Sequence, residues 1–399
     1  MKRFTDIISG ELKDAFEKKG YDSSRVQAAV SNRPDLCEMQ CNAAMALAKS
    51  AGRAPIEIAQ DAVTEVEKSC WLSDVNAVKP GFINMNISGD AIADYVNEMA
   101  ESEKFGFESP AKKKKIIIDY GGANVAKPLH IGHLRSAVIG ESIKRICNFA
   151  GHDATGDVHL GDWGLQMGQI IAELHLRQPD LSYFDESFEG PYPKEAPFTI
   201  SELEEIYPRA SAKCKEDTEF ARKAHEATFL LQSGNPGYKA IWNHVLNVSI
   251  ADLKKNYDAL DVHFELWKKE SDAQPYIPQM IENMKEKGIL KESEGALVVD
   301  ISQDTDKKEL PPCIVVKSDG ATLYSTTDLA TLVERKKLFD PDYIIYVVDK
   351  RQELHFIQVF RTARLSQIVD DDVELRFLGF GTMNGSDGQP YKTRSGGVM

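Results

Sequence analysis

The sequence predicts an α/β protein in which a small α+β domain precedes a doubly wound parallel sheet with a helical insertion. Apolar runs typical of buried strands occur at residues 116–118, 313–316, 321–324, 343–348 and 375–379. Stretches with helical spacing separate these runs, and such alternation favours a parallel sheet with helices on both faces. Near the start of the chain, an apolar residue at every fourth position predicts a separate amphipathic helix, with Phe4, Ile8, Leu12 and Phe16 on its stripe.

Composition sets the broad class. A chain of 399 residues is long enough for two or three domains, and 42% hydrophobic with 28% charged residues is ordinary for a globular protein. The net charge is −14, from 62 acidic and 48 basic residues. Such a balance argues against non-specific coating of nucleic acid, although it leaves room for a local basic face.

Cysteine usage and hydropathy indicate the compartment. The 6 cysteines are scattered without a C-x-x-C pair, which favours reduced thiols and no cysteine zinc site. The first 20 residues mix charges with apolar positions, and no long apolar run occurs anywhere. We therefore expect a cytoplasmic protein with no signal peptide and no membrane segment.

The first domain is expected over residues 1–110. Helices are predicted near the start and at residues 36–50, 55–70 and 90–102. Strands are predicted over 75–87, with a break at Pro80-Gly81. The linker 109–111 and the lysines that follow close this domain, and nothing in it looks catalytic.

The second domain is expected over residues 111–399 and begins with a βαβ unit. Residues 116–118 form its first strand, apolar positions Ile139, Ile143 and Ile146 mark a helix, and residues 153–160 form the second strand. This is half of a Rossmann-like, nucleotide-binding fold. Asp162, in the next loop, is either near the nucleotide or a cap of the following helix, and both interpretations stay open.

An insertion is expected at about residues 181–312. It starts in a Pro-rich stretch and continues in long polar helices at 201–232 and 237–260. The second half of the sheet then returns, with helices at 328–337 and 352–365 between its strands.

The loop after the first strand carries the clearest chemical pattern. Gly121 and Gly122 end the strand, and His130 and His133 flank Gly132 at the start of the next helix. A helix N-terminus offers free N–H groups and the positive end of a dipole to an anion. Two imidazole donors beside a glycine would add to this site, so the loop is expected to bind phosphate.

The residues of this loop resemble a known family. His130-Ile131-Gly132-His133 is similar to the signature of class I aminoacyl-tRNA synthetases, and the longer run over residues 124–136 resembles arginyl-tRNA synthetases in particular. The resemblance continues at residues 161–164, 323–328 and 392–394 and covers nearly the whole chain.

This resemblance implies ATP-dependent activation of L-arginine to arginyl-adenylate, followed by transfer to tRNA(Arg). The residues implied to bind ATP are His130, Gly132, His133 and Lys392. Those implied in catalysis are His130, His133, Lys127, Lys392 and Arg394, the last two in a loop that departs from the class's usual Lys-Met-Ser-Lys-Ser. Mg²⁺ is expected to arrive with ATP on its phosphate oxygens, with no dedicated protein metal site.

The arginine pocket is expected to contain carboxylates, because a buried guanidinium needs acceptors in a fixed fork. Tyr324 and Asp328, one helical turn apart, are implied to face the guanidinium. The α-amino end is implied to meet Asp119, at a position where the family commonly has Glu, together with Asn124 and Gln352. Glu270 is a further match in a region that is harder to align.

The resemblance also implies partners and alternatives. L-arginine, ATP and tRNA(Arg) are the expected partners, of a monomer that binds no membrane, and the N-terminal domain is implied to contact the tRNA elbow. An insertion can edit mischarged tRNA, but a hydrogen-bonding pocket rejects apolar analogues without editing, so support of the acceptor stem or of the fold is expected.

The chain reaches Met399 just after the second signature loop, whereas the family continues into an anticodon-binding domain. A chain that lacks this domain is expected to be inactive in aminoacylation, since the family forms the adenylate only with tRNA bound. The alternatives are another class I synthetase and a non-catalytic, tRNA-binding fragment.

Overall fold

The structure is a computed structural model that describes residues 1–382 except 67–68, 128 and 319. The chain divides into two compact units, Met1–Ser109 and Pro110–Met399. Each unit has its own hydrophobic core.

The N-terminal unit is a four-stranded antiparallel sheet covered by helices. Its elements are α1 (Phe4–Lys18), β1 (Ala29–Val30), β2 (Met39–Cys41), α2 (Ala43–Ala51), α3 (Pro55–Val66), β3 (Leu72–Val78), β4 (Phe82–Ile87) and α4 (Gly89–Glu101). The strand order is β1-β2-β4-β3. The predicted helix at 36–50 is wrong in its first part, because residues 39–41 pair with β4 as a strand and the helix begins only at Ala43.

The second unit is built on a four-stranded parallel sheet. Its strands are β5 (Lys115–Tyr120), β6 (Asp153–Asp157), β10 (Tyr343–Asp349) and β11 (Glu374–Phe380), in the order β11-β10-β5-β6. The chain moves outward from β5 to β6 and, in the second half, outward from β10 to β11. The direction of winding therefore reverses between β5 and β10, which are paired, and in open α/β sheets ligands bind outside the carboxyl ends of the strands at this point.

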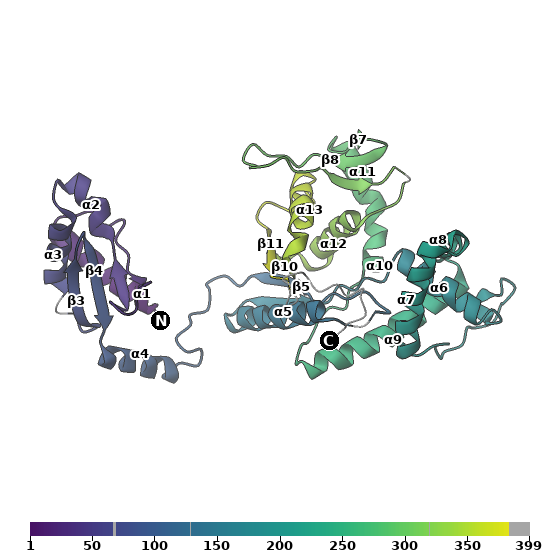
Figure 1. Ribbon diagram of the computed structural model, residues 1–399, viewed down its shortest axis with the longest axis horizontal. Coiled ribbons are helices and arrows are strands. Elements are labelled where there is room, and N and C mark those ends of the chain that lie inside the picture. Colours follow the sequence, from purple (N-terminus) through teal and green to yellow (C-terminus); the bar gives the residue numbers. More distant parts are fainter. Residues whose placement is uncertain (67–68, 128, 319, 383–399) are drawn as a thin grey trace. The chain divides into compact units, whose positions relative to one another are not determined.

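Helices cover both faces of this sheet (Figure 1). The residues of β5 that face α5 (Ile131–Phe149), such as Ile118 and Tyr120, belong to one core. Residues of the opposite face, such as Ile344 and Tyr346, pack with α12 (Tyr324–Phe339) and α13 (Glu353–Leu365), which follows the short η3 (Lys350–Gln352). The predicted doubly wound sheet is confirmed.

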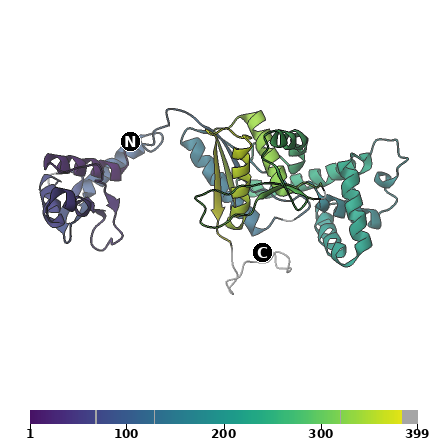
Figure 2. The same cartoon turned by 90° about the horizontal axis from the view of Figure 1, so that it is seen from above.

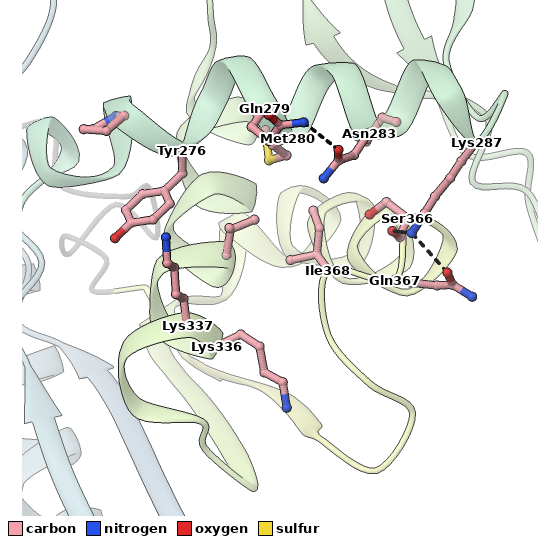
Figure 3. A pocket seen from close by; sticks show the side chains of 13 residues that line it. Tyr276, Gln279, Met280, Asn283, Lys287, Lys336, Lys337, Ser366, Gln367 and Ile368 are labelled. Carbon is pink, nitrogen blue, oxygen red and sulfur yellow. Dashed lines mark hydrogen bonds between the residues drawn. The ribbon is translucent and has the colours of Figure 1, made fainter.

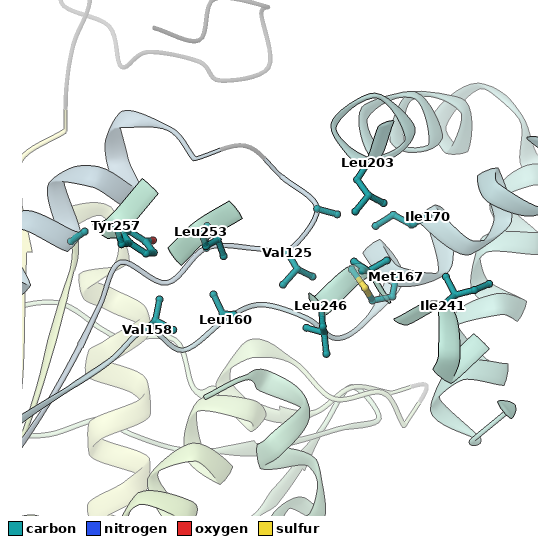
Figure 4. Close-up of a cluster of buried hydrophobic side chains, with 14 of the residues drawn as sticks. Val125, Val158, Leu160, Met167, Ile170, Leu203, Ile241, Leu246, Leu253 and Tyr257 are labelled. Atoms are coloured by element: carbon teal, nitrogen blue, oxygen red, sulfur yellow. The ribbon is translucent and has the colours of Figure 1, made fainter. Parts of the chain in front are cut away.

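A helical group lies to one side of the sheet (Figures 1 and 2). It consists of α6 (Leu165–Arg177), η1 (Ser182–Phe184), α7 (Ile200–Glu216), α8 (Thr218–Gln232) and α9 (Pro236–Ala259). Apolar side chains join it to the loops after β5 and β6 in a continuous core, in which Val125, Met167, Leu203 and Leu246 are buried (Figure 4). The helix predicted over 201–232 is in fact two, because Asp217 ends α7 and caps α8.

The last part of the predicted insertion packs elsewhere. Its elements are α10 (Glu270–Ala273), η2 (Gln274–Tyr276), α11 (Ile277–Glu286), β7 (Lys291–Ser293) and β8 (Ala296–Val299), and β9 (Cys313–Val316) follows it. The strands form a small antiparallel sheet of order β7-β8-β9, so residues 313–316 are a strand but not a strand of the main sheet. Residues 321–323 are not a strand, and α12 begins already at Tyr324.

No helix in the described ranges combines the length and the apolar character that crossing a membrane requires.

Candidate active site

The loop after β5 is held in place from two sides. Gly121 has a φ of +70°, a conformation that favours glycine, and its carbonyl accepts a hydrogen bond from the Tyr257 hydroxyl. Farther along, the backbone N–H of Val125 donates to the carbonyl of Gly161, over 3.0 Å. The loops after β5 and β6 therefore run side by side at the carboxyl edge of the sheet.

The two histidines of this loop lie stacked at the start of α5. Their ring centroids are 3.7 Å apart and their planes differ by 21°. The backbone N–H of Gly132 donates to His130 Nδ1 (3.1 Å), and the backbone N–H of His130 donates to His133 Nδ1 (3.3 Å). Since Nδ1 is an acceptor in both neutral rings, the proton lies on Nε2. The loop thus presents two Nε2–H donors side by side.

Electrostatics keep both rings neutral. Burial, followed by the charges of His130 and Lys127, lowers the pKa of His133 to about 3. Burial also lowers the pKa of His130. At neutral pH the pair therefore consists of neutral donors.

The position between the histidines requires glycine. A Cβ on Gly132 would lie 2.9 Å from His130 Cε1, so only glycine lets this ring lie against the start of the helix.

Lys127 supplies positive charge beside the histidines. Its Nζ lies 4.7 Å from the centroid of the Tyr207 ring, a cation–π distance. Its charge is among the causes that lower the pKa values of both His130 and His133, so all three groups are close.

The start of α5 also contacts the ends of β10 and β11. Ser136 Oγ donates to the Val347 carbonyl over 2.5 Å, and Arg135 Nη1 donates to the Gly381 carbonyl over 2.6 Å. The chain after β11 therefore passes next to the helix that carries the histidines. Lys392 and Arg394 lie outside the described residues.

Three of the predicted arginine-binding side chains come together. Asp328 Oδ2 accepts a hydrogen bond from His355 Nε2 at 2.5 Å. Burial, followed by the charges of Asp162 and Asp328, raises the pKa of Glu270 to about 8. Tyr324 is 72% exposed, yet partial burial and then the Glu270 charge raise its pKa. Glu270, Asp328 and Tyr324 therefore share one electrostatic environment, as does Lys127, which opposes the shift of Glu270.

Asp119 has a partner that the sequence analysis did not anticipate. Arg335 of α12 is 1% exposed and donates through Nη2 to Asp119 (2.5 Å) and to Asp157 (2.7 Å). Asp157 of β6 is the residue paired with Asp119 of β5 in the sheet, so one guanidinium lies between two neighbouring carboxylates. Burial raises the pKa of Asp119, and the Arg335 charge opposes this shift. Arg335 is seven residues after Asp328, two helical turns, so helical spacing was the available signal.

The other predicted contacts lie at the edge of the same region. A Cβ on Gly161 would lie 2.4 Å from Asn124 Oδ1, so the amide of Asn124 packs directly on that glycine. Gln352 is exposed in η3, just after β10. Asp162 is buried, and it accepts hydrogen bonds from the backbone N–H (2.9 Å) and hydroxyl (2.6 Å) of Ser271. The predicted capping of the following helix is wrong, because the N-cap of α6 is Gly164 and no side chain caps it, whereas Asp162 bonds Ser271 of α10.

A cavity of about 600 Å³ lies away from this region, between α11, the end of α12 and the turn after α13 (Figure 3). Its labelled side chains include Tyr276, Lys287 and Lys337. None of the predicted site residues that the structure describes lines it.

A sheet that reverses its winding between β5 and β10, with paired histidines at the first helix N-terminus, defines the catalytic domain of a class I aminoacyl-tRNA synthetase. Comparison with protein families agrees. The family described as "tRNA synthetases class I (R), catalytic domain" matches residues 96–399, and the arginyl-tRNA synthetase N-terminal domain matches residues 2–87. The chain belongs to the arginyl-tRNA synthetase family.

Curated relatives support this assignment. The chain is 59% identical to the arginine–tRNA ligase of Agathobacter rectalis over 100% of its length, and 57% identical to that of Alkaliphilus oremlandii over 98%. It spans 67% of each relative. The function that these relatives establish is arginine–tRNA ligation, with ATP as the energy source of the class.

Solved structures show the same fold. The arginyl-tRNA synthetase of Plasmodium falciparum matches with a TM-score of 0.74 at 24% identity, over 96% of this chain and 66% of that one. The Thermus thermophilus enzyme matches with a TM-score of 0.67 at 19% identity, over 97% and 68%.

Proposed function

We propose that the carboxyl edge of the β5–β10 pair activates arginine with ATP and passes it to tRNA, with the predicted residues in distinct roles. The observation that carries this assignment is that the charge of Lys127 acts both on the stacked histidines and on Glu270, whose pKa the nearby Asp328 raises. Positive and hydrogen-bonding groups for phosphate thus lie beside acidic groups for a guanidinium.

The phosphates of ATP are assigned to the helix start. His130 and His133 donate from Nε2, and the N-terminus of α5 contributes its dipole. Gly132 leaves room for the His130 ring. Neutral donors stabilise charge that develops when the arginine carboxylate attacks the α-phosphate, without a proton transfer. Lys127 adds a positive charge. Lys392 and Arg394 are proposed to bind the leaving pyrophosphate.

Arginine is assigned to the acidic side. Asp328 and Tyr324 are proposed to accept hydrogen bonds from the guanidinium, with Glu270 nearby. Asp119, Asn124 and Gln352 are proposed to meet the α-amino end. In this arrangement Arg335 positions Asp119, because one oxygen of the Asp119 carboxylate already accepts a hydrogen bond from Arg335.

Mg²⁺ is proposed to enter only as part of the MgATP complex. Within residues 1–382 with their gaps, the one set of three close metal-ligating groups is Asp119, Asp157 and His159. The Arg335 guanidinium already bonds both carboxylates, so this set does not fit a resident metal. We also propose that the protein acts on tRNA(Arg) as a monomer in the cytoplasm. Its free cysteines suit a reducing compartment.

The test is binding of ATP, arginine and lysine to this chain, measured by calorimetry. Binding of arginine with strong rejection of lysine is expected, because lysine cannot fill a planar fork of acceptors. Arginine-dependent charging of tRNA(Arg) is expected when the chain is joined to the anticodon-binding domain of a relative. If arginine and lysine bind equally, the assignment of the pocket is wrong.

A further inference from the structure

A second cavity, of about 370 Å³, lies in the helical group and has no role in the reaction above. Its walls come from η1, the loop after it, the end of α8 and the start of α9. Aromatic rings and carboxylates dominate the lining, and no lysine or arginine among the described residues takes part. The aromatic members are Tyr183, Phe184, Phe188, Tyr192 and Tyr238, and the acidic members are Asp185, Glu186 and Glu189.

The aromatic rings form a connected, supported wall. Tyr192 stacks on Tyr183 with centroids 5.3 Å apart and planes 14° apart, and it contacts Phe188 at 5.2 Å. Across the lining, Phe184 meets Tyr238 edge to face at 6.1 Å. The rings therefore hold one another in place, so little ordering remains to be done when a ligand enters.

The polypeptide fixes the base of this wall. The Tyr183 hydroxyl and His244 Nε2 lie 3.0 Å apart, in the buried side of the cavity. A Cβ on Gly237 would lie 2.0 Å from the Tyr183 carbonyl oxygen, so α9 begins in direct contact with η1. These contacts make the cavity part of the folded domain and not a gap between loose loops.

Two of the carboxylates are available to a ligand. Asp185 is occupied, because its side chain accepts hydrogen bonds from the backbone (2.9 Å) and hydroxyl (2.6 Å) of Ser187. Glu186 and Glu189 are exposed, and neither forms an ion pair with any residue in the described ranges. The charge of Glu186 reaches the cavity, since it contributes, after burial and Glu226, to the raised pKa of Tyr238.

We propose that this cavity binds a small organic cation of the alkylammonium class. The faces of aromatic rings attract a cation, and cages of such rings recognise quaternary ammonium groups in particular. Glu186 and Glu189 supply the compensating charge. The volume suits a small molecule, since ligand pockets typically measure about 300–1,000 Å³. A neutral ligand of the same shape would gain the apolar contacts but not the attraction of the rings and carboxylates.

The test uses choline and its neutral isostere 3,3-dimethylbutan-1-ol, titrated into the whole chain and followed by nuclear magnetic resonance. We expect saturable binding of choline with a dissociation constant of roughly 1 mM or lower, and at least about tenfold weaker binding of the isostere. Equal binding of the two ligands, or no saturable binding of choline, would overturn the proposal.

Matched variants locate the ligand. The double substitution Glu186→Gln/Glu189→Gln changes only exposed side chains and is expected to weaken choline binding at least about tenfold. Glu195→Gln, an exposed carboxylate outside the lining, is the control and should leave binding unchanged. Unchanged binding in the double variant would place choline elsewhere and sink the idea. Tyr192→Leu should also weaken binding, and the affinities for arginine and ATP should be unaffected by the glutamate changes.

Discussion

Arg335 of α12 donates a hydrogen bond to Asp119 of β5 over 2.5 Å, between residues 216 positions apart in the sequence. The same guanidinium nitrogen bonds Asp157 of β6. One buried cation thereby ties the helix that carries Tyr324 and Asp328 to the strand that leads into the histidine loop. The two proposed ends of the arginine site are connected through this contact.

Replacing Arg335 by methionine is expected to destabilise the protein by about 3–5 kcal/mol, because Asp119 and Asp157 would be left as buried carboxylates without a cation. Urea denaturation followed by fluorescence measures this change. Arg222→Met is the matched control. Arg222 pairs with Glu219 and Glu226 on the surface of α8, and its loss should leave the stability nearly unchanged, because exposed ion pairs contribute little. Equal effects of the two substitutions would contradict the structural role of Arg335.

Asp328→Asn is expected to weaken arginine binding by about 2–5 kcal/mol, since an ionic acceptor of the guanidinium is lost. The affinity for ATP should stay nearly unchanged, because the histidine loop is intact. Calorimetric titration with each ligand separates the two effects. Parallel loss of both affinities would mean that Asp328, through its bond to His355, supports the fold and not the ligand.

His133→Ala is expected to reduce the turnover number about 100-fold and to change ATP affinity far less. A preplaced donor stabilises charge that develops only in the transition state. Steady-state aminoacylation kinetics, measured in a form that carries the anticodon-binding domain of the family, and ATP titration measure the two quantities. His225→Ala, an exposed histidine of α8, serves as the control and should leave the kinetics unchanged. A normal turnover number in His133→Ala would remove this residue from the mechanism.

The affinity for arginine is expected to rise with pH up to about 8 and then level off. Glu270, whose pKa is about 8, is neutral below that pH, and a guanidinium favours the ionised carboxylate. Arginine must therefore displace a proton at pH 6 to 7, at a cost of up to about 1.4 kcal/mol per pH unit. Calorimetry across pH 6–9 measures the slope. The profile of Glu270→Gln should be flat, and an unchanged profile in that variant would exclude Glu270 as its source.

The raised pKa of Glu270 also predicts how the stability of the folded protein changes with pH. The pKa of Glu270 is raised above its ordinary value of 4.5, so the unfolded chain loses this proton at lower pH than the folded protein. Stability should therefore fall as pH rises from 4.5 to 8, since the folded state binds more protons in that window. Glu270→Gln should be more stable than the parent at pH 8 and nearly equal to it at pH 4.5. Thermal unfolding at the two pH values tests this expectation.

The sequence by itself determined the local architecture and the chemistry of the histidine loop. Three isoleucines, a glycine break and helical spacing after His130 are local patterns, and each reports on the backbone that contains it. Tyr324 and Asp328 were predicted to lie one helical turn apart, but Tyr324 was also assigned to a strand, and only the structure shows both on α12.

The tertiary structure decided everything that depends on which elements meet. Residues 313–316 were predicted correctly as a strand, but only packing places them in an antiparallel sheet beside β8. Asp162 accepts a hydrogen bond from Ser271, 109 residues away, and Arg335 lies between two carboxylates of different strands. The pKa of Glu270 is also a tertiary property, because burial and the nearby charges of Asp162 and Asp328 come from distant segments. The periodicity of apolar residues reports the secondary-structure preference of one segment. Strand pairing and burial arise only when distant segments come together.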